Sequence, residues 1–356
     1  MELDEGDEEK LSCGDDLDTV GLSTGVHASA AAMNPVPARK RHNGAALNNT
    51  EELLMRLRVT VILCFFMLCA LASPLWAQDA PPEVTFEATE LAPGLYMLVG
   101  VGGFGGGNVG LLKGEDGVVM VDDSFPPHTE KLVAAVAKVA GAPVDFVINT
   151  HVHGDHLGGN PAFHEKGATI VAHDNVRGRL VKNGFPTPDG VQPAPPEMLP
   201  VLTFDDTVTF HLNGQESFVF HVADAHTDGD AIIHFKNADV IHMGDVFFHT
   251  LFPFIDVDNG GGIDGYIAAQ EKVLSMASDS TKIIPGHGPL ATKKDLEASV
   301  KMLKAARDSI GAMIKDGKTV EEILEAKPLA DYEAQSWQFI STERMIRQVH
   351  RSLSGG

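Results

Sequence analysis

Short apolar runs alternate along the chain with segments that have the spacing of amphipathic helices. Several of the runs end in acidic or small polar residues, which is typical of buried strands. Residues 128–140 instead place Leu132, Val133, Val136 and Val139 on one side, which predicts a helix. The pattern predicts strands at 95–100, 109–112, 117–122, 144–149, 169–172, 231–235, 240–243 and 282–284, and helices at 128–140, 162–166, 264–276, 295–314, 319–325 and 342–353. Because strands dominate both halves and helices interleave, we expect two packed sheets with helices outside.

Three further segments carry turn or cap signals. Residues 201–220 alternate enough for a hairpin, with a tight turn at Asn213-Gly214. Residues 184–200 are rich in proline and glycine, which predicts a surface loop. Thr319 and Glu322 have the spacing of a capping box, which predicts that a helix begins there.

The N-terminal part differs in composition from the rest. Residues 1–54 are polar and low in aromatic residues, and we interpret them as disordered or as a mis-annotated extension. Residues 55–77 combine a basic start, an apolar stretch and a small residue before a polar one, which indicates a signal peptide. An uncleaved anchor is the alternative, but a membrane span needs about 20 apolar residues, and the stretch 59–72 is shorter. We therefore expect a catalytic domain over 78–356 that is periplasmic or secreted and has no stable membrane association after cleavage.

Cysteine positions and net charge narrow the chemistry. The three cysteines, Cys13, Cys64 and Cys69, all precede the expected domain, which therefore has no disulfide and no thiolate ligand. Any metal in the domain must be held by histidine and carboxylate side chains. The formal net charge of −22 repels phosphate backbones, so nucleic acid is not an expected partner.

The most informative segment is the run 151–156, which reads His-Val-His-Gly-Asp-His and directly follows a predicted buried strand. His151 and His153 are two residues apart, so at a strand end both can face one metal ion. Asp155 and His156 lie beyond the turn and are expected to face a second metal position.

Three later residues each come after a predicted buried strand, namely His226, Asp245 and His287. Two metal ions need about three to four protein ligands each. The spacing favours a first group made of His151, His153 and His226, and a second made of Asp155, His156 and His287, with Asp245 between them.

This ordered set of residues resembles the metallo-β-lactamase superfamily over roughly residues 88–290. The resemblance implies an α/β fold, specifically an αβ/βα four-layer sandwich, with two Zn²⁺ per chain at the edge of the two sheets. It also implies hydrolysis by a metal-bridging hydroxide, because zinc lowers the pKa of bound water to about 7. Asp155 would ligate the second zinc and orient the hydroxide, which makes it the catalytic side chain.

Two positions depart from the β-lactamase branch of that family. Asp245 stands where that branch commonly has a cysteine, and Phe248 stands where it often has a lysine for the drug's carboxylate. Both departures disfavour efficient β-lactam hydrolysis, while the Gly158-Gly159-Asn160 run keeps that function under consideration. The leading hypothesis is a zinc hydrolase of a small amide or lactam, with weak β-lactamase activity. The alternatives are a thioester hydrolase of the glyoxalase II kind, a lactone hydrolase, an iron-dependent oxidoreductase of the same fold, and a non-catalytic binding protein. The expected partner is a small-molecule substrate, and the oligomeric state is left open.

Residues 100–105 match a dinucleotide-binding fingerprint, with Asp122 about 20 residues further on. No helix is predicted after these glycines, so we reject that interpretation. A hairpin flap with Phe104 at its tip, or a plain turn, remains as the prediction.

Overall fold

The structure is a computed structural model that describes residues 83–355. The disordered extension expected at 1–54 and the signal peptide expected at 55–77 lie outside the described residues. Within residues 83–355, no helix combines the length and apolar character that crossing a membrane requires.

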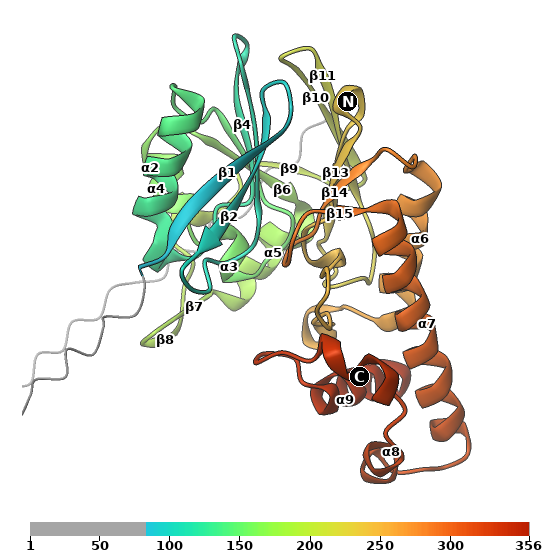
Figure 1. Cartoon of the computed structure of the whole chain (residues 1–356). Coiled ribbons are helices and arrows are strands. Elements are labelled where there is room, and N and C mark those ends of the chain that lie inside the picture. Colours follow the sequence, from blue (N-terminus) through green and yellow to red (C-terminus); the bar gives the residue numbers. More distant parts are fainter. Residues whose placement is uncertain (1–82, 356) are drawn as a thin grey trace, which may run out of the picture. The chain divides into compact units, whose positions relative to one another are not determined.

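Seven strands form the first sheet, in the order β1-β2-β3-β4-β5-β6-β9. Strands β1 to β4 pair antiparallel, and β4, β5, β6 and β9 pair parallel. Their bounds are β1 (Thr85–Ala92), β2 (Leu95–Val101), β3 (Val109–Gly114), β4 (Gly117–Val121), β5 (Phe146–Ile148), β6 (Thr169–His173) and β9 (Leu202–Phe204). Helix α2 (Thr129–Ala140) packs Leu132 and Val136 on this sheet, as its apolar spacing predicts (Figure 1).

Six strands form the second sheet, in the order β10-β11-β12-β13-β14-β15. Their bounds are β10 (Thr207–Leu212), β11 (Gln215–His221), β12 (Ala231–Phe235), β13 (Val240–His242), β14 (Lys282–Ile284) and β15 (Ala291–Thr292). The pair β13–β14 is parallel and is connected through helix α6 (Ile263–Met276), whose Ala269 and Val273 pack on the sheet. Helix α7 (Lys293–Lys315) packs beside α6 (Figure 1).

The two sheets pack face to face. Val121 and Ile148 of the first sheet share one buried cluster with Val219, Ile233 and Val240 of the second. Helices on one sheet, two sheets, and helices on the other sheet make the expected αβ/βα sandwich, so the predicted fold class is confirmed. The described strands of both sheets end near residues 151, 245 and 287, where polar residues follow.

The C-terminal helices form a further cluster. Helices α8 (Val320–Ala326) and α9 (Thr342–Leu353) pack with α7 around buried apolar side chains, among them Met345, Ile346 and Val349. The capping box of Thr319 and Glu322 is present, as predicted. The other short helices are η1 (Pro126–His128), α3 (Gly154–Leu157), α4 (Asn160–Glu165), α5 (Asp174–Asn183), η2 (Pro196–Met198), η3 (Lys236–Ala238), η4 (Gly244–Val246), η5 (Val257–Asn259) and η6 (Ala330–Gln335).

Some local predictions differ from the structure. Strand β1 and helix α5 were not predicted, because most β1 side chains are exposed and α5 is predominantly polar. The loop expected at 184–200 contains a small hairpin of β7 (Phe185–Thr187) and β8 (Gly190–Gln192). The predicted hairpin at 201–220 does turn at Asn213-Gly214, but it begins only at β10, because β9 pairs in the other sheet.

Candidate metal centre

All seven residues that the sequence singles out lie together at one edge of the two sheets. His151 and His153 follow β5, and Asp155 and His156 lie in α3. His226 lies between β11 and β12, Asp245 in η4 after β13, and His287 after β14. The ligand set therefore draws on both sheets.

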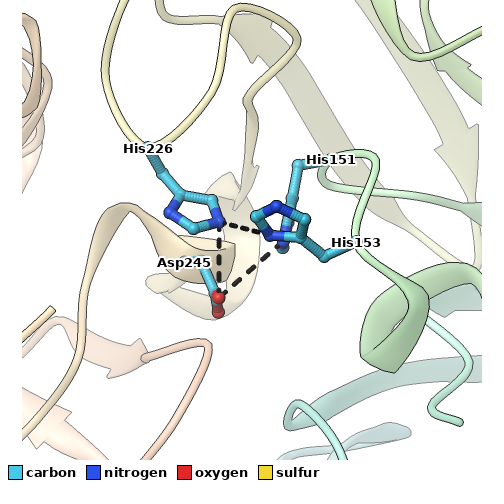
Figure 2. A group of neighbouring side chains, drawn as sticks. All are labelled: His151, His153, His226 and Asp245. Atoms are coloured by element: carbon cyan, nitrogen blue, oxygen red, sulfur yellow. Dashed lines mark hydrogen bonds and ion pairs between the residues drawn. The ribbon is translucent and has the colours of Figure 1, made fainter. Parts of the chain in front are cut away.

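The first group contains His151, His153, His226 and Asp245, whose ligand atoms lie within 4.8 Å of one another. Nε2 of His226 lies 2.8 Å from Nδ1 of His153 and 3.5 Å from Oδ2 of Asp245. Nε2 of His151 lies 3.7 Å from the same carboxylate oxygen. Figure 2 shows the three imidazole rings and the Asp245 carboxylate converging on one point.

The second group contains Asp155, His156 and His287. Oδ2 of Asp155 lies 3.6 Å from Nε2 of His156 and 3.2 Å from Nε2 of His287, and the two nitrogens are 3.4 Å apart. Oδ1 of Asp245 lies 3.0 Å from Nε2 of His156 and 3.4 Å from Nε2 of His287. The two oxygens of Asp245 therefore face different groups, as expected for a residue that lies between them.

This donor set fits divalent metal ions. Ligand atoms 2.0–2.1 Å from a tetrahedral zinc ion lie about 3.4 Å from one another, and the separations in the second group match that spacing. Nε2 of His151 is buried and has no hydrogen-bond partner among the described residues, which is costly unless an ion binds there. Imidazole nitrogens and carboxylate oxygens are ligands that zinc accepts.

Buried acceptors fix the histidine tautomers. The Asp122 carboxylate accepts hydrogen bonds from Oγ1 of Thr150 (2.8 Å) and Nδ1 of His156 (2.7 Å). Since the Thr150 hydroxyl donates to Asp122, its oxygen accepts from Nδ1 of His151, 2.9 Å away. Both Nε2 atoms are therefore left with lone pairs that face the ligand groups.

A loop of the second half orients the other first-group histidines in the same way. Nε2 of His153 donates to Oδ2 of Asp256 (2.8 Å), and Nδ1 of His226 donates to the carbonyl oxygen of Phe254 (2.7 Å). The opposite ring nitrogens, Nδ1 of His153 and Nε2 of His226, are the two that lie 2.8 Å apart. Four of the five histidines thus have one nitrogen held by a fixed acceptor and the other left for an ion.

Electrostatics differ between the two groups. Burial lowers the pKa of His226 to about 4, and it lowers the pKa of His151 well below its usual range, helped by the neighbouring imidazoles. Burial would also lower the pKa of His287, but Asp245 and Asp155 outweigh it and raise that pKa to about 9. Asp245, Asp155 and Asp122 likewise raise the pKa of His156 against burial. Burial would raise the pKa of Asp155, but His156 and His287 lower it to about 2.

Two glycines allow the chain to approach these groups closely. A Cβ at Gly107 would lie 2.2 Å from Cε1 of His156, and a Cβ at Gly286 would lie 2.0 Å from Oδ1 of Asp245. The Gly107 amide donates to the carbonyl oxygen of Asp155 (3.0 Å), and Nδ2 of Asn108 donates to that of Pro285 (2.8 Å). The glycine-rich segment is followed by strand β3, as the sequence predicts, and not by the helix that a dinucleotide-binding fingerprint requires.

A pocket of about 640 Å³ lies over the two groups, with Asp155, Asp245 and His287 among the residues that line it. Phe104 also lines it and stacks on His287, with ring centroids 5.4 Å apart. The predicted flap residue therefore lies at the site. Phe248 is buried, and the centroid of its ring lies 5.0 Å from that of the His287 ring.

Sequence reasoning did not identify Asp122, Thr150 or Asp256 as functional residues. Asp122 directly follows the buried strand β4, and Thr150 lies two residues after β5, and this position after a strand was the available signal. Asp256 lies in a loop, and its contact with His153 depends on packing that no local pattern encodes.

A family model and several known proteins match the sequence of this chain. A family model described as the metallo-beta-lactamase superfamily matches residues 102–287, which is more than half of the chain. A hydroxyacylglutathione hydrolase from a Polaromonas species is 27% identical over 167 residues, and the match covers 46% of this chain and 56% of that protein. The chain thus spans about half the length of this relative.

Two further proteins cover more of the chain. A metallo-beta-lactamase type 2 from Bacillus cereus is 23% identical over 231 residues, which are 62% of this chain and 83% of that protein. The solved structure of the metallo-beta-lactamase FIM-1 from Pseudomonas aeruginosa, in its mono-zinc form, has a TM-score of 0.52 and 19% identity. It covers 64% of this chain and 98% of its own, and at that identity it shows the shared fold.

Proposed function

The chain belongs to the metallo-beta-lactamase superfamily, and on this premise we propose that it is a dizinc hydrolase that opens a small amide, lactam or ester. The convergence of seven ligand residues from both sheets, with the two Asp245 oxygens facing different groups, is the observation that carries the proposal. We propose His151, His153 and His226 as ligands of one ion, Asp155, His156 and His287 as ligands of the other, and Asp245 as the bridge.

Zinc, when bound, supplies hydroxide at neutral pH and stabilises the oxyanion that forms. The chain's own residues hold and orient the reactants. Asp155 is ionised at neutral pH because its pKa is lowered to about 2, and it lines the pocket, so it can accept a hydrogen bond from the attacking water. Phe104 and Phe248 pack around His287 and limit the access of bulk water.

The named candidate is slow β-lactam hydrolysis, which the Bacillus cereus relative supports. Phe248 occupies the position where a lysine would bind a drug's carboxylate, so we expect poor turnover. The second candidate is hydrolysis of a thioester or lactone. It is favoured by the aromatic pocket lining and by the hydroxyacylglutathione hydrolase relative. We further propose a periplasmic or secreted location and a small-molecule partner.

Metal analysis beside a substrate panel tests this proposal. The purified full chain is expected to hold about two zinc ions and to hydrolyse at least one of nitrocefin, a hydroxyacylglutathione thioester and an acylated lactone. The His151→Ala variant should lose that activity, whereas Leu202→Ala, an exposed change on β9, should keep it. Iron in place of zinc would favour the oxidoreductase. Intact metal binding without turnover would favour a binding protein.

A further inference from the structure

A chain of aromatic rings surrounds the pocket above the ligand groups. Each ring lies close to the next, with centroid separations between 5.4 and 6.4 Å. Ordered around the pocket, the rings are those of Phe125, Phe104, His287, Trp337, Phe339, Phe254 and His153. A substrate that reaches the ligand groups therefore meets flat apolar surfaces on several sides.

Two of these rings belong to residues 336–341, between η6 and α9, which lie beyond the stretch matched by the family model. We call the segment 336–341 the C-terminal wall. Nε1 of Trp337 donates to the carbonyl oxygen of Phe252 (2.9 Å). The Arg344 guanidinium lies 4.1 Å from the Phe339 ring and 5.2 Å from the Phe254 ring. These contacts hold both aromatic side chains in place, although Phe339 is 45% exposed.

Among the described residues that line the pocket, the basic side chains are the ligand-group histidines His153 and His287. Among the described residues that line it, none is a lysine or an arginine, and the acidic side chains are Asp155 and Asp245. Arg344 donates from Nη1 to the carbonyl oxygen of Phe339 (2.9 Å) and does not line the pocket. An anionic group placed against the Trp337 ring would lose water with no lysine or arginine of the pocket lining to pair with it, which is unfavourable. An aromatic or aliphatic group would bury apolar surface there.

We propose that the C-terminal wall is a specificity element that selects an uncharged apolar or aromatic substituent beside the scissile bond and disfavours an anionic one. This inference rests on the proposed hydrolase function and names its substrate class. Trp337 and Phe339 are the specificity-determining side chains. Gln338 lies between them at the pocket and is exposed, so a charged side chain can replace this neutral one without disturbing the core.

Two esters that differ by one charge test the inference. 4-Nitrophenyl butyrate is uncharged, whereas the mono-4-nitrophenyl ester of succinic acid has a similar length and a terminal carboxylate. We expect kcat/KM to favour the uncharged ester by about tenfold or more, beyond the ratio of their spontaneous rates. Trp337→Ala should lower kcat/KM for the uncharged ester about tenfold and change the anionic one less. Gln338→Lys should raise kcat/KM for the anionic ester about threefold, and Gln338→Glu should lower it. Leu202→Ala should leave the ratio of the two kcat/KM values unchanged.

A binding measurement separates this inference from the proposed function. Trp337 fluorescence is titrated with 4-nitrophenyl butyl ether and with 4-(4-nitrophenoxy)butanoate, neither of which is an ester, and Trp337→Phe identifies the signal. Tighter binding of the uncharged probe, without hydrolysis of either ester or of nitrocefin, the thioester and the lactone, would support the specificity role of the C-terminal wall and reject the hydrolase. Hydrolysis that depends on His151, with equal kcat/KM and equal binding for both charge types, would overturn the inference and leave the hydrolase standing.

Discussion

The two ligand groups share Asp245, but protons compete with a metal ion for their histidines to different extents. In the first group, burial keeps His151 and His226 neutral, with the pKa of His226 lowered to about 4. In the second, Asp245 and Asp155 raise the pKa of His287 to about 9, so in the absence of an ion this imidazole is protonated at neutral pH. Only the neutral form ligates a metal, so an ion entering the second group must displace a proton.

The comparison shows that similar residue types can make unequal metal sites. In the first group, burial favours neutral His151 and His226, whereas in the second group Asp155 and Asp245 attract both a proton and a metal cation. We therefore expect the first group to fill at lower pH and the second to respond steeply to pH.

The largest effect is expected from Asp245→Ala, because this carboxylate serves both groups. Hydrolysis should fall about a thousandfold, and zinc content should fall at both sites. His287→Ala is the matched variant, since it should remove only the second ion. Metal analysis of the two variants checks the difference. Equal metal loss in both would contradict the assignment of Asp245 as the bridge.

The next effect is the pH dependence of metal affinity. Below the pKa of about 9 at His287, each pH unit adds at least tenfold more proton competition, and His156, whose pKa is also raised, adds to it, so lowering pH from 8 to 6 should weaken the second ion about a hundredfold or more. His226, with a pKa of about 4, has no proton to lose over that range. Competition with a chromophoric chelator at several pH values measures both affinities. Parallel pH slopes would remove the distinction between the groups.

A smaller effect is expected from Asp256→Asn. The carboxylate holds Nε2 of His153, and such supporting hydrogen bonds contribute about 10–100-fold to metal affinity. The first ion should weaken about tenfold and the second should change little. Asp258→Asn, an exposed change in the same loop, serves as the control. If the second ion weakened instead, the proposed division of ligands would need revision.

The smallest effect concerns Gln348 of α9. Its Nε2 donates to the carbonyl oxygen of Pro253 (2.6 Å), and its Oε1 accepts from the amide of Ile255 (3.2 Å), on either side of Phe254. Gln348→Leu leaves both backbone groups without this partner, which costs about 1–3 kcal/mol. The melting temperature should fall by about 2–4 °C for each kcal/mol, and the first ion should weaken slightly. The exposed change Arg347→Gln should alter neither, and thermal unfolding with metal titration would detect a departure.

Much of the site could be predicted from the sequence because its ligands follow buried strands. The apolar runs before His151 and His287 predict two buried strands, and they also predict that both residues lie at the edge where these strands end. Histidine and aspartate at these spacings then have few alternative interpretations. The same runs predict two packed sheets with helices outside, and the resemblance to the family implies the αβ/βα order of the layers.

The remainder depends on tertiary packing. Asp122 is an acidic residue after a strand, and only the contacts with Thr150 and His156 show its role. Trp337 and Phe339 lie in a segment with no periodic pattern, and they reach the pocket because α9 packs on α7. Strand β1 was missed because a mostly exposed edge strand carries few apolar residues.

The distribution of the ligands over both sheets has a consequence for synthesis of the chain. A nascent polypeptide that has passed His156 carries one sheet's ligands, but Asp245 and His287 emerge only with the second sheet, and Trp337 later still. Fragments released early lack several residues of the candidate metal centre. On the proposed function, hydrolysis therefore requires the segments of both sheets to have been synthesised.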